Sequence, residues 1–595
     1  MDTENITQEH SERASRDHSA TEAWLIGGGI ASLAAAVHLI NDAQVPPSQI
    51  HILEARPTPG GSMALEPRGA PERKGYVIRA ARKLNFSYRC LYDTLSRVPH
   101  PHPHASPEPA DEGFEEVRSE DGQVGTLLDY IRSGGGEARN RGRTKVRLVA
   151  CGEGGPETVD TGTMGLEPVH QAALMSLILG SEESLGASTI RDSFEIGFFE
   201  TNFWDMFSTM YLFKPWHGAV EFRRYLHRFL HEVPNMGSMS GVEYMPMNDF
   251  DAAIVPMVKY LEGQGVDFHY GELRIPCISD FRVVAKNVDT TAQSIDFAPD
   301  TDDIVVSNLA LRSGGVERNV PVKPDDVVLA TLGSMVSGSK RGTNTTPPAP
   351  LPKLAEIRAN PDPAWRLWLR LADPEVNRHA AQFGDPRLFY ENHDETMGVA
   401  FTVTLFEDNF IDHLLEWAGS PRGICPLLSF RDCPWLLSIT VPRQPYFAGQ
   451  DPGTTVFWGY GLYPDQPGRF VQKPMLECSG REILTELLCL MGRPLEPTLG
   501  NSVTLPELMP LITSPYATRG KDSRPKVIPQ GSRNLGLMGQ FVEMEGDVTF
   551  TMEYSVRSAQ VGVYGLTGVE KRVAEVFGGD PSAVVLGEAV KTMMI

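Results

Sequence analysis

The chain has 595 residues, of which 41% are hydrophobic and 22% charged, as is typical of a globular protein with three or four domains of about 100–200 residues. Its formal net charge of −22 argues against a general nucleic-acid binder, because contact with phosphates needs clustered Lys and Arg. The same charge opposes adsorption of the whole molecule to an anionic membrane, although Arg223, Arg224 and Arg228 leave a local, transient contact with a membrane surface open.

The cysteines and the N-terminal residues indicate the cellular compartment in which we expect the protein. Seven cysteines are scattered without CxxC or any other zinc-binding spacing, so we expect reduced thiols, a cytoplasmic protein and no metal site. Residues 1–20 are polar and lack the apolar core of a signal peptide, which predicts a disordered tail. The histidines in the Pro- and acid-rich run 100–123 fit a surface loop better than a metal site, because the flanking prolines keep the segment extended.

A strand, a tight turn and a buried helix are predicted near the N-terminus. Residues 23–26 are apolar, Gly27–Gly29 follow, and residues 30–41 are rich in Ala and Leu. The uncharged run 23–40 just reaches the length of a membrane span, but three consecutive glycines favour the strand–turn–helix. Residues 51–55 predict a second strand. The chain therefore opens as a βαβ unit, which is typical of a parallel sheet.

A dinucleotide-binding fingerprint lies at the turn of this unit. Gly27 permits the tight turn, Gly29 lets the backbone approach a pyrophosphate, and Ser32 is small enough for the helix to pack against the strand. The start of the helix then presents free N–H groups to a phosphate. Glu54 ends the next strand, where a carboxylate can accept hydrogen bonds from the ribose hydroxyls of an adenosine. A second glycine pair follows at 60–61, as in many flavoproteins, so FAD is the expected ligand.

Further along the chain, helical and strand patterns alternate. Residues 203–234 are rich in aromatic and basic side chains, and 217–232 have the periodicity of an amphipathic helix. Residues 339–353 predict a Pro-rich linker. The other expected elements are a helix at 257–264, strands at 266–270 and 326–330, a helix near 480–491, and strand, turn and helix within 535–570.

Several long blocks make the chain similar to one protein family. They are WLIGGGIASLAAAVHLI, HILEA and GGS, then KGYVIRAARK and FKPWHGAVEFRRYLHRFLHE, then VFWGYGLYPD and KPMLEC, and finally GQFVEMEGDVTFTMEYSVRSAQVGVYGL. In this order they span residues 23 to about 567 and resemble the oleate hydratase family, once called the myosin-cross-reactive antigens. Members of that family bind FAD without net redox chemistry. They add water across a cis double bond of a fatty acid, typically converting oleate to 10-hydroxystearate.

The resemblance implies an architecture and partners. It implies an α/β protein with a discontinuous Rossmann-type FAD-binding domain, an α+β substrate domain and a C-terminal helical segment that covers the substrate entrance. It also implies a homodimer and an unsaturated fatty acid as substrate. The expected boundaries are 21–98, 235–338 and 505–565 for the FAD-binding domain, 125–234 and 350–504 for the substrate-binding regions, and 566–595 for the helical cap.

The matched blocks also imply site residues. Those expected to bind FAD are Gly27, Gly29, Ser32, Glu54, Gly61, Ser62, Arg82, Thr331, Glu543 and Thr549. Those expected to contact the fatty acid are Thr440, Tyr446 and His217, with core packing as the alternative for His217. Thr440 and Tyr446 stand in the run that helps to hold the carboxylate in the family. That run departs from the family pattern, because Pro442 replaces Asn and Tyr446 replaces His.

The two catalytic positions also depart from the family. The family's catalytic Glu follows Arg-Gly-Gly-Arg, whereas here the run 79–82 carries two alanines and Lys83 comes next. The family's catalytic Tyr follows Phe-Trp, whereas here Asp205 stands in that place. Desolvation by aromatic neighbours could raise the pKa of Asp205, so that it donates the proton. Lys83 could pair with Asp205, which would lower that pKa, or contact the flavin or a phosphate.

Three functional hypotheses follow. The first is an FAD-dependent hydratase of unsaturated fatty acids with Asp205 and Lys83 at the reaction centre. The second keeps FAD but changes the reaction to double-bond isomerisation or oxidation of a polyene or lipid, because the family's catalytic pair is replaced. The third is a non-catalytic protein that binds FAD and lipid.

Overall fold

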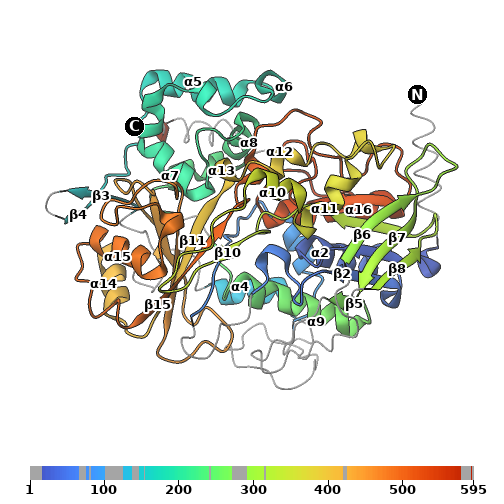
Figure 1. Cartoon of the computed structure of the whole chain (residues 1–595), viewed down its shortest axis with the longest axis horizontal. Helices are drawn as coiled ribbons and strands as arrows, with labels where there is room; N and C mark the ends of the chain where they lie inside the picture. Colours follow the sequence, from blue (N-terminus) through green and yellow to red (C-terminus); the bar gives the residue numbers. More distant parts are fainter. Residues whose placement is uncertain are drawn as a thin grey trace.

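The structure is a computed structural model, and it describes residues 17–65, 75–79, 82–100, 125–136, 147–152, 155–239, 243–270, 291–313, 316–419, 425–577 and 591–592. The described strands form a five-stranded, an eight-stranded and a three-stranded sheet. In Figure 1 the eight-stranded sheet lies to the left, the two smaller sheets lie to the right, and helices α5 (Pro168–Leu179) and α6 (Glu182–Leu185) cross the top.

The five-stranded sheet is parallel, with the strand order β16-β9-β1-β2-β5. Its strands are β1 (Ala23–Ile26), β2 (Ile50–Glu54), β5 (Asp267–Tyr270), β9 (Val327–Thr331) and β16 (Leu535–Met538). Helix α2 (Ile30–Asn41) connects β1 to β2 and packs against α16 (Met552–Thr567). A parallel sheet with a helical crossover at its first turn confirms the expected α/β, Rossmann-type fold. It also shows residues 23–41 as strand, turn and helix.

The eight-stranded sheet has the order β10-β15-β11-β14-β13-β12-β3-β4. Its strands are β3 (Leu148–Gly152), β4 (Gly155–Thr158), β10 (Lys340–Arg341), β11 (Gly398–Leu405), β12 (Cys425–Phe430), β13 (Leu437–Val441), β14 (Thr455–Gly461) and β15 (Ser502–Met509). All neighbours are antiparallel except β12 and β3. We expected the segment 339–353 to be a linker. Two of its residues instead form β10, because they pair with β15.

The two faces of this sheet have different partners because side chains alternate along each strand. Val399, Phe401 and Phe457 belong to a core shared with α14 (Asn409–Ala418) and α15 (Gly480–Leu490). Ala400, Trp458 and Tyr460 point the other way, into a separate apolar cluster. One face is therefore closed by helices, and the other turns toward the middle of the molecule.

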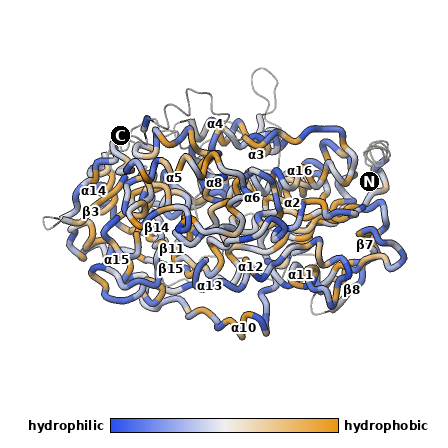
Figure 2. The backbone as a smooth tube through the Cα atoms, turned by 90° about the horizontal axis from the view of Figure 1, so that it is seen from above, coloured by the Kyte–Doolittle hydropathy of each residue, from blue (hydrophilic) through white to orange (hydrophobic). Residues whose placement is uncertain are grey.

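The three-stranded sheet is an antiparallel meander of β6 (Thr291–Phe297), β7 (Val306–Ser313) and β8 (Val316–Pro321). It shares a core with one face of the parallel sheet and with α11 (Pro363–Leu371). The remaining regular helices are α3 (Arg89–Leu95), α4 (Leu127–Gly136), α7 (Asn202–Tyr211), α8 (Ala219–Phe229), α9 (Val255–Gln264), α10 (Leu354–Ala359), α12 (Arg387–Tyr390) and α13 (His393–Thr396). Figure 2 shows hydrophobic stretches concentrated in the interior and hydrophilic stretches dominating the periphery.

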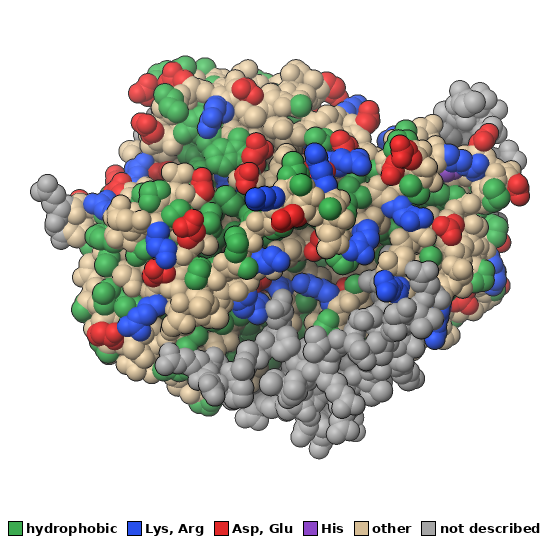
Figure 3. All heavy atoms as spheres, in the orientation of Figure 1, with side chains coloured by type: hydrophobic (Ala, Val, Ile, Leu, Met, Phe, Trp, Pro, Cys, Tyr) green, Lys and Arg blue, Asp and Glu red, His purple; other side chains and the backbone are tan. Residues whose placement is uncertain are grey.

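Two of the three arginines of α8, Arg224 and Arg228, are buried, and Arg223 is partly exposed, which differs from the basic surface considered for membrane contact. Arg224 is 3% exposed and pairs with Glu182 at 2.6 Å. Arg228 is 1% exposed and pairs with Asp547 at 3.1 Å. Arg223 donates to the carbonyl of residue 180 at 2.8 Å. The aromatic face of α8 and these ion pairs together draw the helix into the fold. Acidic and basic side chains are interspersed over the face of the molecule in Figure 3.

The ends of the chain differ in part from the expectations. Helix α16 ends at Thr567, and residues 568–577 continue without helix, although 566–595 was expected to be a helical cap. Residues 578–590 and 593–595 of that cap, and residues 1–16 of the expected tail, lie outside the described part of the chain. The described cysteines Cys90, Cys151, Cys433, Cys478 and Cys489 are free thiols. No helix among the described residues is both long and apolar enough to cross a bilayer.

The packing of α15 on β15 predicts that substitution by alanine has different effects on stability at two helical glycines. A Cβ on Gly480 would overlap the carbonyl oxygen of Thr504, whereas a Cβ on Gly263, in α9, meets open space. We expect Gly480→Ala to lower the free energy of unfolding by about 1–3 kcal/mol through overpacking. Gly263→Ala is the matched control and should be neutral or stabilising by up to about 1 kcal/mol. Thermal unfolding of both variants tests this, and equal melting temperatures would contradict it.

Candidate functional site

The first glycine turn is shaped by the side chain of Glu54. Gly27 has a φ of 101°, a left-handed conformation that favours glycine. The Gly28 N–H donates to Glu54 Oε2 at 2.7 Å, and a Cβ on Gly28 would lie 2.9 Å from the Glu54 side chain. The Arg56 N–H donates to the other carboxylate oxygen at 2.8 Å. Burial raises the pKa of Glu54, and the two N–H groups oppose that rise. The end of β2 is thus held against the turn that begins α2.

A second glycine turn completes a cradle with the first. Gly60 and Gly61 have φ values of 108° and 56°. A Cβ on Gly61 would lie 3.2 Å from Gly29 Cα, so the two turns meet with no side chain between them. The Gly60 N–H donates to the Gly28 carbonyl at 2.8 Å. Backbone, and not side chains, therefore surrounds the start of α2, which suits a phosphate group.

A cavity of about 470 Å³ lies on this cradle. Its wall comprises the two glycine turns, the end of β2, residues after β9 within 331–339, and residues 539–541 after β16. These segments follow the carboxyl ends of parallel strands, where nucleotides bind in this class of fold. Thr331 lines this cavity, and its buried Oγ1 has no hydrogen-bond partner among the described residues. Ser32 is fully buried and is not part of the wall.

The structure brings most of the expected nucleotide-binding residues together. Those that line the cavity are Gly27, Gly29, Glu54, Gly61, Ser62 and Thr331. Arg82 lies at the border of the cavity and donates to Ser62 Oγ at 2.8 Å and to Asp249 at 3.1 Å. Thr549 lies behind the wall and donates to the carbonyl of Gln540 at 3.1 Å. Gln540 itself lines the cavity, so Thr549 would act through it.

Glu543 lies away from the cradle, in a cluster of ion pairs. Its carboxylate is 2.8 Å from Arg224 and 2.9 Å from Arg519, and Arg519 also pairs with Glu221 at 2.9 Å. Glu543 is not among the described residues that line the cavity. The cluster ties α8 to the segment that leads into α16. The cluster therefore supports the wall of a second space, called the chamber, which adjoins the cradle.

That chamber is apolar and has a volume of about 210 Å³. It shares Ile30, Ser62, Met335 and Gln540 with the cavity on the cradle, so the two spaces adjoin. The open face of the eight-stranded sheet forms one side of it. Methionine is frequent in its wall, at Met63, Met210, Met236, Met239, Met335, Met397, Met509 and Met552. Flexible thioether side chains of this kind adapt to an irregular apolar ligand.

Polar groups accompany the methionines on the chamber wall. Glu232 is the one carboxylic acid among the described residues that line it. Asn85 Nδ2 donates to Glu232 Oε1 at 3.0 Å. Lys83, Tyr88 and Tyr211 line the same chamber. Burial raises the pKa of Tyr211 well above its ordinary value, and the nearby charge of Glu232 adds to that rise.

Asp205 does not join Lys83 on this wall. It lies in the first turn of α7, is 8% exposed, and has its Oδ2 2.8 Å from Arg431. Burial raises the pKa of Asp205 to about 6, against the opposing effect of Arg431. The upward shift has the direction expected from the aromatic neighbours. A pair with Lys83 was one of the alternatives open from sequence, but the structure gives Asp205 a different ionic partner in Arg431, which follows β12.

A lysine close to His217 reaches the chamber, and the histidine does not. His217 is 1% exposed, and its Nδ1 accepts a hydrogen bond from the Lys214 N–H at 3.0 Å. Burial lowers the pKa of His217 well below its ordinary value. Lys214 lines the chamber, and its Nζ donates to the carbonyls of Met397 at 2.7 Å and Glu395 at 3.4 Å. Burial lowers the pKa of Lys214 to about 7.

Thr440 and Tyr446 face different spaces. Thr440, on β13, lines the chamber. Tyr446 lines a small hollow of about 30 Å³ beside it, together with Arg79 and Arg82. Burial raises the pKa of Tyr446 well above its ordinary value. A single bound carboxylate in the chamber could therefore contact Thr440 directly, with Tyr446 behind the arginines.

Sequence reasoning missed three residues of the site. Arg79 lines both spaces, and its Nε donates to Glu507 at 2.6 Å. Burial would raise the pKa of Glu507, but the arginines beside it lower that pKa overall. Arg79 and Lys214 stood inside matched blocks, so a search of those blocks for buried charges could have found them. Glu232 is the last residue of the block that contains Lys214, but its place on the chamber wall depends on the turn that follows α8.

Together, these features define a protein of Rossmann-type α/β fold with an apolar chamber next to the glycine cradle. The chain belongs to the MCRA family, whose model matches residues 20–564.

Two relatives match over most of their length. An oleate hydratase of Streptococcus pyogenes serotype M49 is 30% identical over 93% of this chain and 86% of its own. A linoleate hydratase of Lactiplantibacillus plantarum is 28% identical over 92% of this chain and 94% of its own. A solved oxidoreductase from Methanosarcina mazei covers 92% of this chain at 10% identity with a TM-score of 0.45, a likeness that supports no inference.

The burial of Lys214 predicts a pH effect on stability. Its pKa of about 7 in the folded chain lies below the ordinary 10.5, so the unfolded chain binds more protons between these values. The contribution of Lys214 to the free energy of unfolding therefore rises with pH over that window. Relative to Lys214→Met, the free energy of unfolding of the wild type should rise by about 2 kcal/mol between pH 7 and pH 9.

Chemical denaturation at the two pH values measures this difference. Lys521→Met, at a position whose side chain is 79% exposed, is the control and should show no such change. A difference between wild type and Lys214→Met that does not vary with pH would contradict the prediction.

Proposed function

We propose that this chain is a hydratase of unsaturated fatty acids that contains FAD, and that oleate is converted to 10-hydroxystearate. The observation that carries the proposal is the junction of a glycine cradle with an apolar chamber. At that junction a cofactor and a fatty chain would meet beside Ile30, Ser62 and Gln540. Relatives named oleate hydratase and linoleate hydratase support the same class of reaction.

The cradle fits FAD. Glu54 would accept hydrogen bonds from the ribose hydroxyls of the adenosine half. The backbone of Gly29 and Gly61, at the start of α2, would face the pyrophosphate. Thr331, at the end of β9, would lie beside the cofactor on the wall of the cavity. When bound, FAD supplies a planar ring beside the chamber and no net electron transfer.

Glu232 and Tyr211 are the residues to which we assign the proton transfers. Hydration of an alkene needs a proton at one carbon and a water oxygen at the other, and its transition state is cationic. Glu232 would orient the water, stabilise the positive charge and accept the proton that the water loses. Tyr211, whose pKa burial and then the charge of Glu232 raise, so that the phenol is protonated, would deliver its hydroxyl proton to the other carbon. Return of the proton from Glu232 to Tyr211 restores both groups, so the net change is the addition of one water.

The two residues expected to be catalytic receive other roles in this proposal. A cation next to a forming carbocation is unfavourable, so we assign Lys83 to an anionic group, either the fatty-acid carboxylate or a phosphate of the cofactor. Asp205, paired with Arg431 at 2.8 Å, would hold the first turn of α7 in place. That helix ends at Tyr211 and so carries the proposed proton donor.

A different reaction on the same scaffold is the second candidate. The placement of Lys83 on the chamber wall, where the family has its catalytic Glu, favours an FAD-dependent isomerase or oxidoreductase, or a protein that only binds FAD and lipid. Flavin bleaching by an added alkene, followed by reoxidation, would show that the flavin is reduced and reoxidised during the reaction. An unchanged flavin spectrum during formation of a hydroxy acid would exclude it. Assembly as a homodimer and a cytoplasmic location stay predictions.

The contact between the two glycine turns predicts the effect of a methyl group on FAD binding. Gly61→Ala would place a Cβ 3.2 Å from Gly29 Cα, at the start of α2, and we expect FAD affinity to fall about tenfold or more. Gly449→Ala is the matched control, because Gly449 has a similar φ of 65° but open space around its Cβ. Flavin titration followed by fluorescence measures both. Equal FAD affinity in the two variants would contradict the proposed cradle.

The assignment of Glu232 predicts a loss of hydration with retention of structure. We expect Glu232→Gln to lower kcat on oleate by about 100-fold or more, because an amide cannot accept the proton from water. Glu375→Gln, at an exposed position, is the control and should keep wild-type activity. The measurement is the hydroxylated product from oleate and linoleate, with FAD present and absent. An active Glu232→Gln variant would overturn the role of Glu232, and a wild type that hydrates no unsaturated acid would overturn the proposed function.

A further inference from the structure

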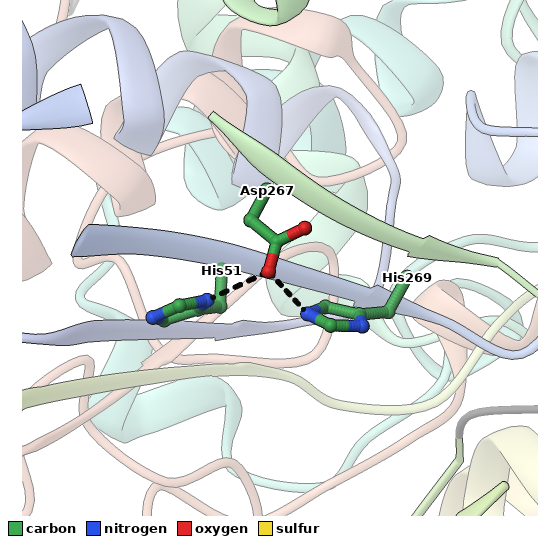
Figure 4. A group of neighbouring side chains, drawn as sticks. All are labelled: His51, Asp267 and His269. Carbon is green, nitrogen blue, oxygen red and sulfur yellow. Dashed lines mark hydrogen bonds and ion pairs between the residues drawn. The ribbon is translucent and has the colours of Figure 1, made fainter. Parts of the chain in front are cut away.

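Two histidines and an aspartate meet on one face of the parallel sheet, at its edge. His51 lies on β2 and is directly opposite Asp267 on the edge strand β5. His269 lies two residues beyond Asp267 on β5, so it points to the same face. Figure 4 shows the three side chains converging, with the carboxylate of Asp267 between the two imidazole rings.

The distances suit a shared metal ion. Asp267 Oδ2 lies 3.3 Å from His51 Nδ1 and 2.9 Å from His269 Nε2. Three ligand atoms, one from each residue, lie within 4.8 Å of one another. In a tetrahedral zinc site with bonds of about 2.0–2.2 Å, neighbouring ligand atoms are about 3.3–3.6 Å apart. Small side-chain rotations therefore convert the observed cluster into three corners of a tetrahedron.

The surroundings of His51 fix its ring as a metal ligand requires. Its other nitrogen, Nε2, lies 2.8 Å from Glu22 Oε2. Histidines that bind metals commonly donate the remaining N–H to a carboxylate, which sets the tautomer and makes the free nitrogen a better ligand. The ring of Trp24 stacks on the ring of His51, with centroids 4.1 Å apart and an angle of 17° between the two rings. The Nδ1 atom is thus directed at Asp267 before any ion is present.

We propose that His51, Asp267 and His269 bind a divalent transition-metal ion, and that this ion is zinc. Two imidazoles and one carboxylate suit zinc, nickel and copper, whereas magnesium and calcium prefer sites built from oxygen alone. Three protein ligands leave the fourth position to water. This site is separate from the proposed reaction. Its first ligand, His51, lies near the start of β2, whereas Glu54 of the nucleotide cradle ends the same strand about 10 Å further along.

The bound ion would join the edge strand to its neighbour. Among the described strands, β5 pairs with β2 alone, and the ion would add a link between the two strands on one face. The ligands come from residues 51 and 267–269, so they meet only when the sheet has formed. A metal that binds the folded chain and not the unfolded one stabilises the fold in proportion to its affinity. The expected role is therefore structural.

Zinc binding to the full-length, FAD-loaded protein tests the proposal. After dialysis against a chelator, the protein is titrated with zinc in competition with a chromophoric zinc indicator. We expect one tight site in the wild type, its loss in His269→Ala, and its retention in His413→Ala, a matched histidine on α14. Glu22→Gln should weaken zinc binding by about 10–100-fold, because it removes the partner of a ligand and not the ligand itself.

Two further measurements make the result specific. Zinc should raise the melting temperature of the wild type and of His413→Ala but not that of His269→Ala, and magnesium and calcium should raise none of them. Anomalous scattering at the zinc edge should place the ion between His51 and His269. Equal zinc affinity in wild type and His269→Ala, or an ion located elsewhere, would overturn the proposal. A folded His269→Ala variant is confirmed by its FAD content, which the proposal expects to be unchanged.

Discussion

The contact between the carboxylate of Glu54 and the backbone of Gly28 organises the centre of the molecule. It joins the end of β2 to the turn that begins α2, and it is possible only because residue 28 has no side chain. The same close approach recurs between Gly61 and Gly29. Packing of backbone against backbone leaves the start of α2 open to a phosphate. The position of the cavity, and of the chamber that adjoins it, follows from these contacts.

Buried charges hold the chamber wall in place. Arg79 and Glu507 link a segment near the cradle to β15, and burial makes breaking such a pair costly because one charge would be left without a partner. Arg228 and Arg557 both bind Asp547, which ties α8 to α16. The apolar interior of the chamber therefore has a rigid, charged frame around it. This arrangement suits a ligand that is apolar along its length and must be held in one register.

The cradle was predictable from sequence because its physical requirements are local. Gly27, Gly29 and Glu54 are close in the chain, and each is needed for a stated reason at a stated position. The helix 30–41 and the strands of the parallel sheet were predictable for the same reason, since their hydrophobic patterns are continuous. Whether Asp205 pairs with Lys83 was harder to predict, because it depends on which face of α7 turns toward the chamber. The roles of Glu232 and of the cluster of His51, Asp267 and His269 depend on tertiary contacts, which the sequence around each residue does not reveal.

The most direct measurement of the central claim is a crystal structure of the protein with FAD and oleate bound. The account predicts that the adenosine ribose contacts Glu54 and that the acyl chain lies in the methionine-lined chamber. It also predicts that the double bond lies beside Glu232 and Tyr211. An FAD molecule away from Glu54, or a double bond that faces neither of these two residues, would contradict it.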